Sequence, residues 1–151
     1  MKIRLRNKIS RVVLKGVKDR PGIAAKIFTT LGEHGFGIEN ISETGLSRGR
    51  ADISFTILDR DLEEVVSLLK TRIASYGAEE VKVDRDVVEI MIRGKDANRP
   101  GMAGKVFAIL GGLGINIEMI TTALNTLTMV IQRNRADEAL KALNQRFGDS
   151  S

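Results

Sequence analysis

The sequence predicts an α+β fold of two similar lobes, each with the order strand, helix, strand, strand, helix, strand. An internal repeat is the first observation: residues 19–28 (DRPGIAAKIF) return as residues 98–107 (NRPGMAGKVF). The two prolines of the chain, Pro21 and Pro100, hold the same place in both copies, at an offset of 79 residues. Hydrophobic periodicity around each copy is the second observation, because it switches between the strand period and the helix period. A repeat of this kind marks one supersecondary unit made twice.

The first lobe opens with strands and the repeated turn. Residues 2–6 alternate polar and apolar side chains, and residues 11–17 form a second, stronger strand. A helix follows the Pro-Gly turn and ends near Gly32 and Gly35. Its apolar face, which we expect to be buried, consists of Ile23, Ala24, Ile27, Phe28 and Leu31.

A hairpin, a helix and a strand complete the first lobe. Residues 38–44 and 52–57 are the hairpin strands, joined by a loop at residues 47–50. The helix begins near Asp61, and a short strand at residues 81–83 closes the lobe. The buried stripe of this helix is Leu62, Val65, Val66, Leu69 and Ile73.

The second lobe repeats this order but stops early. Residues 88–93 are a strand, 102–113 a helix, and 115–121 with 126–132 a hairpin, after which the last helix begins near Asn134. Its inward residues are Ala136, Ala139, Leu140, Leu143 and Phe147. This lobe therefore lacks its final strand.

The spare strand at the N-terminus supplies what the second lobe lacks. We expect residues 2–6 to pair into the second sheet, so that the first lobe, residues 10–85, is inserted into the second, residues 1–9 with 86–151. The pairing removes one exposed sheet edge. Each lobe then has the ferredoxin-like βαββαβ order, an antiparallel sheet with its helices on one face.

Composition excludes several kinds of chemistry. The 151 residues are 42% hydrophobic and 28% charged, which is ordinary for a globular protein. The chain has no cysteine and one histidine, His34, so disulfides, thiolate sites, a His-based triad and multi-His metal sites are excluded. We expect no cofactor, no metal and no catalytic site.

Membrane and nucleic-acid binding are also not expected. No apolar run approaches the roughly 20 residues that span a bilayer, so a cytoplasmic location is the expectation. The net charge of +5 is concentrated early in the chain, in Lys2, Arg4, Arg6, Lys8, Arg11, Lys15, Lys18 and Arg20. Base-stacking aromatic residues are few, however, and Phe28, Phe55 and Phe107 fall on core periodicity. A solvated basic face is the simpler interpretation.

The repeated turn has the chemistry of an anion site. Asx-Arg-Pro-Gly at a helix start points backbone amides outward, and Gly22 or Gly101 lets a ligand approach the backbone. We expect Glu39 or Glu118 to lie close by and to accept hydrogen bonds from an ammonium group. Together these groups match a free α-amino acid. The alternative is that Asp19 and Asn98 serve only as helix N-caps.

Three segments carry a resemblance to ACT domains, amino-acid-sensing modules, and specifically to the paired ACT region of aspartokinases. They are residues 16–28 (GVKDRPGIAAKIF), 51–56 (ADISFT) and 114–122 (GINIEMITT). The resemblance implies effector sites between ACT lobes, where lysine or threonine binds and inhibits a kinase domain. By that resemblance the first site comprises Asp19, Arg20, Pro21, Gly22, Ile23, Ala24, Glu39, Asn40, Ile41 and Ser42. A second possible site comprises Asn98, Gly101, Met102, Ala103, Glu118, Met119 and Ile120.

The sequence departs from that family in ways that make the two sites unequal. Thr121-Thr122-Ala123-Leu124 stands where aspartokinases usually have Ser-Thr-Ser-Glu, and Glu39 replaces a common Asp. Because Asn98 replaces Asp19, we expect the first site to prefer lysine and the second a neutral side chain. Residues typical of a kinase domain are absent from this chain, so a kinase partner would be a separate chain or another part of a longer one.

Three functions are therefore compared. The first is an amino-acid-binding regulator that forms a homodimer through the strands at residues 38–44 and 115–121. The second is an oligomerisation module that has lost its ligand, and the third, less favoured, is a nucleic-acid binder on the same fold.

Overall fold

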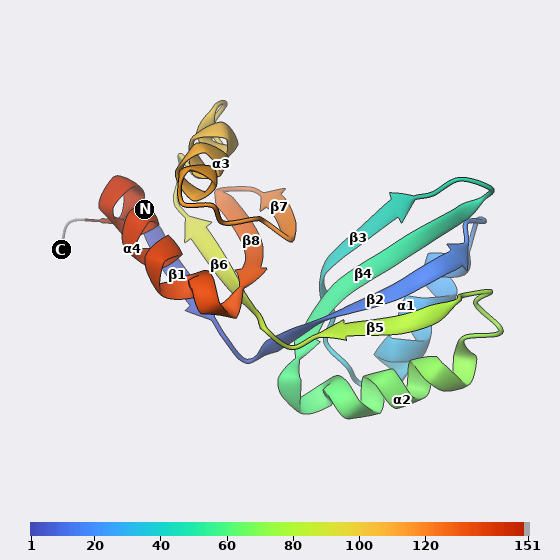
Figure 1. Ribbon diagram of the computed structural model, residues 1–151. Coiled ribbons are helices and arrows are strands. Elements are labelled where there is room, and N and C mark those ends of the chain that lie inside the picture. Colours follow the sequence, from blue (N-terminus) through green and yellow to red (C-terminus); the bar gives the residue numbers. More distant parts are fainter. Residues whose placement is uncertain (150–151) are drawn as a thin grey trace. The chain divides into compact units, whose positions relative to one another are not determined.

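The computed structural model describes residues 1–149, which divide into two compact units. One unit is Lys8–Arg85. The other joins Met1–Asn7 to the chain from Asp86 onward (Figure 1). The two segments of this second unit are therefore far apart in the sequence and adjacent in space.

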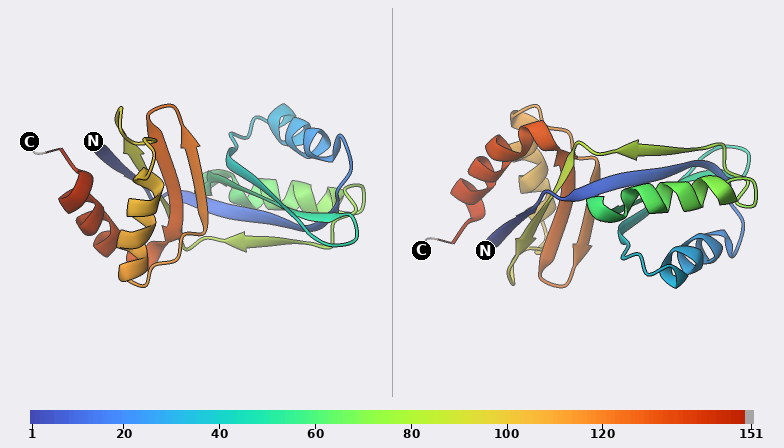
Figure 2. Two further views of the ribbon diagram at one scale, coloured as in Figure 1. Left: turned by 90° about the horizontal axis from the view of Figure 1, so that it is seen from above. Right: turned by 90° about the horizontal axis from the view of Figure 1, so that it is seen from below.

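The unit Lys8–Arg85 is a four-stranded antiparallel sheet with both helices on one face (Figures 1 and 2). The strand order is β3-β4-β2-β5. Its elements are β2 (Ile9–Lys18), α1 (Ile23–Glu33), β3 (Glu39–Gly45), β4 (Arg50–Leu58), the 3₁₀ turn η1 (Asp59–Asp61), α2 (Leu62–Arg72) and β5 (Glu80–Asp84).

Spacing along α1 produces the core of this unit. Ile23, Ile27 and Leu31 recur every four residues, so they share one helix face and are buried on the sheet. Phe28 packs edge-on against Phe55 of β4, with ring centroids 5.6 Å apart. These contacts hold α1 on the sheet, and the candidate site lies in the turn between the end of β2 and the beginning of α1.

The second unit has the strand order β1-β6-β8-β7. Its elements are β1 (Lys2–Arg6), β6 (Val87–Arg93), α3 (Met102–Gly112), β7 (Met119–Ala123), β8 (Thr126–Gln132), the 3₁₀ turn η2 (Arg133–Arg135) and α4 (Ala136–Phe147). Strand β1 pairs antiparallel with β6, with Lys2 opposite Arg93 and Arg6 opposite Glu89. The predicted fold class is confirmed: two ferredoxin-like lobes, the first inserted into the second.

Strand β7 is shorter than the sequence predicts. It begins at Met119, whereas the prediction placed the strand at residues 115–121. Ile115 instead ends the helix region: its amide donates to the carbonyl oxygen of Leu110 (2.9 Å) and its side chain is buried in the core. Residues 115–118 are apolar and polar in alternation, which is why they resemble a strand.

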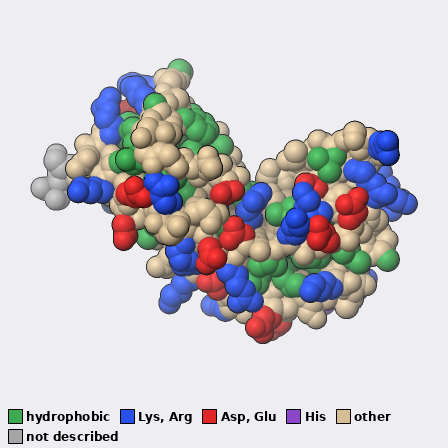
Figure 3. All heavy atoms as spheres, viewed as in Figure 1, with side chains coloured by type: hydrophobic (Ala, Val, Ile, Leu, Met, Phe, Trp, Pro, Cys, Tyr) green, Lys and Arg blue, Asp and Glu red, His purple; other side chains and the backbone are tan. Residues whose placement is uncertain are grey.

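The expectation that Phe28, Phe55 and Phe107 are all buried is wrong for Phe107. It is 46% exposed on α3, whose buried face is Met102, Val106 and Leu110. In the first lobe the equivalent Phe28 rests on Phe55, but Met129 occupies the place of Phe55 in β8. Hydrophobic side chains lie at the surface around α3 (Figure 3).

Among residues 1–149, no helix is long and apolar enough to cross a membrane.

Candidate functional site

The candidate site begins with the turn before each first helix. Gly22 and Gly101 are the N-cap residues of α1 and α3, with left-handed φ angles of 89° and 88°. Within the described residues 1–149, no side chain caps the N-terminus of either helix by a hydrogen bond. The suggestion that Asp19 and Asn98 cap these helices is therefore wrong, because the chain turns once more before the helix begins.

Free amides surround each of these glycines. In the first lobe, Ile23 N donates to Arg20 O (3.2 Å), whereas the amides of Gly22, Ala24 and Ala25 meet no acceptor among residues 1–149. A Cβ built on Gly22 or Gly101 would meet nothing within 4 Å. Each turn therefore offers unpaired N–H donors and open space at the positive end of a helix, which suits a carboxylate.

The same pattern recurs in the second lobe. Met102 N donates to Arg99 O (3.0 Å) and Lys105 N to Gly101 O (3.1 Å). Within the described part of the chain, the amides of Gly101, Ala103 and Gly104 have no acceptor. Both repeats thus keep the backbone part of an anion site.

Asp19 of the first lobe is paired with a carboxyl group that the sequence did not single out. Its backbone amide donates to Gly49 O (2.8 Å), and its side chain lies near the Glu43 carboxyl group of β3. Partial desolvation, hydrogen bonding with Asp19 and the negative charge of Asp19 raise the pKa of Glu43 above the usual glutamate range. The turn therefore carries an acidic pair beside its free amides.

Glu39 does not lie beside this turn within one lobe, contrary to the expectation. Glu39 and Arg11 both pair with Thr56 of β4, so they lie at the same position along the sheet. The turn instead follows Lys18, which pairs with Arg50 at the other end of β4. At about 3.3 Å per residue, Glu39 and the turn are separated by roughly 20 Å.

Asn40 gives the start of β3 its shape. It has a left-handed φ of 52°, within an irregular register between Glu39 and Ser42. Its Nδ2 donates to Thr56 Oγ1 (2.9 Å), and the Thr56 hydroxyl donates to Glu39 O (3.2 Å). The side chain of Asn40 is therefore occupied in holding the strand, and Ile41 beside it is 52% exposed.

The second lobe lacks the acidic part of the site. Glu118 Oε1 accepts a hydrogen bond from Gln132 Nε2 (3.2 Å), and Met119 is only 7% exposed. Thr122, opposite Leu127, stands where the first lobe has Glu43 opposite Ile53. With Asn98 in place of Asp19, this turn has no carboxylate pair.

The residues predicted for the two sites differ in their exposure to solvent. Those that are exposed are Asp19, Arg20, Pro21, Gly22, Glu39, Ile41, Asn98 and Gly101. Those that are half-buried are Ala24, Asn40, Ser42, Ala103, Glu118 and Ile120. Ile23, Met102 and Met119 are buried. No group of three or more His, Cys, Asp or Glu side chains suited to a metal ion occurs among residues 1–149.

Comparison with known proteins agrees with this architecture. Profiles of the ACT domain match residues 11–74 and residues 90–147. The structure of the ligand-free regulatory subunit of aspartate kinase from Thermus thermophilus is similar over 96% of both chains, with a TM-score of 0.89 and 30% identity. This chain belongs to the ACT domain family.

The tandem ACT chain matches aspartokinases over part of their length. An aspartokinase of Thermus thermophilus is 31% identical over 141 residues, which cover 91% of this chain and 35% of the relative. The chain thus spans about a third of the length of the curated relatives that it matches. A structure described as aspartokinase alpha and beta subunits aligns over 99% of both chains, with a TM-score of 0.91 and 27% identity. The chain corresponds to the regulatory part of these proteins.

Proposed function

We propose that this chain is an amino-acid-binding regulator of an aspartate kinase, with lysine as the ligand of its first lobe. The observation that carries the proposal is the first turn, where free amides and the Asp19–Glu43 pair occur together. The amides would bind the ligand carboxylate, and the acidic pair would bind an ammonium group. A ligand with one carboxylate and two ammonium groups fits this turn better than a neutral amino acid.

In this proposal, a complete site needs a lobe from another copy of the chain. Glu39 and the turn lie at opposite ends of β3, which is an edge strand. Antiparallel pairing of β3 with the edge strand of another lobe would place the start of one strand beside the end of the other. Glu39 of one lobe would then approach the turn of its neighbour and accept hydrogen bonds from the ligand α-ammonium group. We therefore propose a homodimer that associates through the edge strands β3 and β7.

The second lobe would take a neutral amino acid, such as threonine, if it is occupied. Its turn keeps the free amides around Gly101 but has Asn98 and Thr122 in place of the two acids. Without a negative pair, a second ammonium group on the ligand would lose its hydration and gain no partner.

Calorimetric titration of the chain with lysine and with threonine tests the assignment. We expect Asp19→Asn to lower lysine affinity by about 1 to 3 kcal/mol, as for the loss of a charged hydrogen-bond partner. Asp137→Asn removes an exposed carboxylate from the first turn of α4 and serves as the matched control, with unchanged binding. If lysine binds Asp19→Asn as tightly as the parent, or binds neither, the turn is only a helix start.

A kinase chain is the proposed regulatory target. The similar structure described as alpha and beta subunits contains a chain of nearly the same extent as this one. Copurification of this chain with an aspartate kinase catalytic chain from the same source, and lysine inhibition of the mixture, would support the proposal. Kinase activity that is insensitive to this chain would contradict it.

A further inference from the structure

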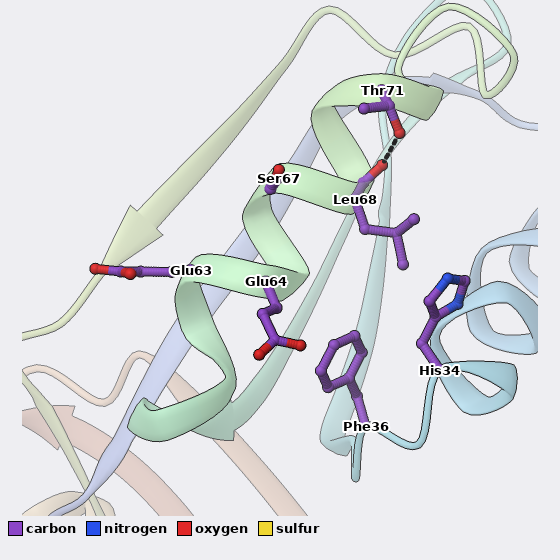
Figure 4. A pocket seen from close by; sticks show the side chains of 7 residues that line it. All are labelled: His34, Phe36, Glu63, Glu64, Ser67, Leu68 and Thr71. Atoms are coloured by element: carbon purple, nitrogen blue, oxygen red, sulfur yellow. Dashed lines mark hydrogen bonds between the residues drawn. The ribbon is translucent and has the colours of Figure 1, made fainter.

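A second surface feature lies on the helical side of the first lobe, away from the turn. It is an open groove of about 470 Å³ between the end of α1 and the exposed side of α2. Figure 4 shows Phe36 between Glu64 and His34, with Leu68 beside them. We call this feature the α1–α2 groove.

The aromatic wall of the groove is held in place. His34 Nδ1 donates to the carbonyl oxygen of Thr30 (2.8 Å), one turn earlier on α1. The His34 and Phe36 rings are stacked, with centroids 6.4 Å apart and planes 6° apart. Phe36 and Leu68 are partly buried on the core, so they offer a fixed apolar surface.

The charge in the groove comes from α2. Glu63 and Glu64 both stand in its first turn, where the helix dipole stabilises carboxylates. Figure 4 shows that they point in different directions: Glu64 reaches toward Phe36, whereas Glu63 extends away from it. Neither has an ion-pair or hydrogen-bond partner among residues 1–149. The dipole accounts for the presence of both carboxylates, but not for the orientation of Glu64 toward Phe36 (Figure 4).

We propose that the α1–α2 groove binds a basic segment of a partner protein, which inserts an Arg or Lys side chain between Glu64 and Phe36. The charged head pairs with the Glu64 carboxylate and lies near the negative face of the Phe36 ring. Its alkyl stem covers Phe36 and Leu68, as long cationic side chains commonly do on apolar surfaces.

The form of the groove favours a protein partner. Small-molecule sites enclose most of their ligand, whereas this groove is open along one side. A single side chain carried by a docked segment fills such a groove without being enclosed. Phosphate-rich partners are disfavoured because Glu64 would repel them.

Titration of the ¹⁵N-labelled chain with the peptide acetyl-Leu-Arg-Leu-Arg-amide tests the inference. We expect chemical-shift changes at His34, Phe36 and Leu68, and none with the matched peptide in which Glu replaces Arg. Glu64→Gln should weaken binding about tenfold, the effect of losing one charged hydrogen bond. Glu63→Gln, one residue away with its side chain turned outward, should bind as the parent does. Phe36→Leu keeps the apolar surface, loses the ring and should weaken binding severalfold.

Three results would overturn the inference. One is equal affinity of Glu64→Gln and Glu63→Gln, which would make the contact a general charge effect. A second such result is chemical-shift changes confined to Asp19 and Glu43, which would show that the basic peptide binds at the turn and not in the groove. The third is concentration-dependent shifts in the groove without peptide, which would make a second copy of the chain the occupant. Because free lysine is titrated separately, failure here leaves the proposed amino-acid site untouched.

Discussion

At the residue scale, the buried hydroxyl group of Tyr76 lowers the stability of the core of the first lobe. Tyr76 is 1% exposed, and its buried hydroxyl has no hydrogen-bond partner among residues 1–149. We expect Tyr76→Phe to raise the free energy of unfolding by about 1 to 2 kcal/mol, since it removes an unsatisfied buried polar group and keeps the ring. Urea denaturation measures the change. Tyr76→Leu leaves a cavity and should destabilise the protein. A loss of stability in Tyr76→Phe would mean that the hydroxyl has a partner.

If lysine binds at the first turn as proposed, the raised pKa of Glu43 should make its affinity depend on pH. The carboxyl group is protonated more readily than an ordinary glutamate because of partial desolvation and Asp19. A bound ammonium group favours the deprotonated pair, so binding should release a proton and strengthen as pH rises from about 4.3 through the raised pKa. Calorimetry at about pH 5 and about pH 7.5 measures this. Glu43→Gln should remove the dependence, and an unchanged profile in that variant would assign the effect to another group.

At the element scale, an irregularity near the end of β2 sets the direction of the chain into the turn. The register shifts between Leu14 and Val17, and Gly16 has a left-handed φ of 62°. Asp52 of β4 holds this bulge: its Oδ1 accepts from Gly16 N (2.9 Å) and its Oδ2 from Lys15 Nζ (2.5 Å). The bulge therefore depends on one ionised side chain.

The lowered pKa of Asp52 makes the stability that this bulge contributes depend on pH. Burial alone would raise that pKa, but the hydrogen bonds from Lys15 and Gly16 outweigh burial and lower it. A lowered pKa contributes stability that is fully present above the unfolded value of about 3.9 and is lost as pH falls through the lowered pKa of the folded protein. We expect Asp52→Asn to cost about 1 to 2 kcal/mol at neutral pH and less at about pH 3, measured by urea denaturation. The same cost at both pH values would show that the charge is not involved.

The order of elements could be predicted because it follows from local patterns. Alternation in residues 2–6 and the missing last strand together predict that β1 joins the second sheet, where it pairs with β6. The exposure of Phe107 could not be predicted, because it depends on Met129 in a distant strand. The Asp19–Glu43 pair and the distance of Glu39 from the turn depend on register through β4, including the irregularity between Glu39 and Ser42. Sequence spacing contains no such information.

At the scale of the whole molecule, duplication kept the backbone of the site and changed its charge. Both turns retain a left-handed glycine and free amides. The first turn has the carboxylate pair Asp19 and Glu43, whereas Asn98 and Thr122 stand at the equivalent places of the second lobe. Under the proposed function, the amides would recognise a group that all amino acids share, and the side chains around them would determine which amino acid is preferred. Two lobes with different side chains would then respond to two different ligands.

In the proposed dimer, the edge strands would determine whether the first site is complete. Ile41 on β3 is 52% exposed, and Val83 on β5, the opposite edge of the same sheet, is 40% exposed. If dimerisation pairs β3 with another lobe, Ile41→Asp should give the 16.6 kDa monomer in light scattering at micromolar concentration, because a charge would be buried at the interface. Lysine binding should weaken together with dimerisation, although every residue of the turn is unchanged, because Glu39 of the neighbouring copy is then absent. Val83→Asp introduces the same charge on the other edge and should preserve both dimer and affinity. A monomeric parent chain, or a monomeric Ile41→Asp that binds lysine as tightly as the parent, would show that a single lobe holds the whole site.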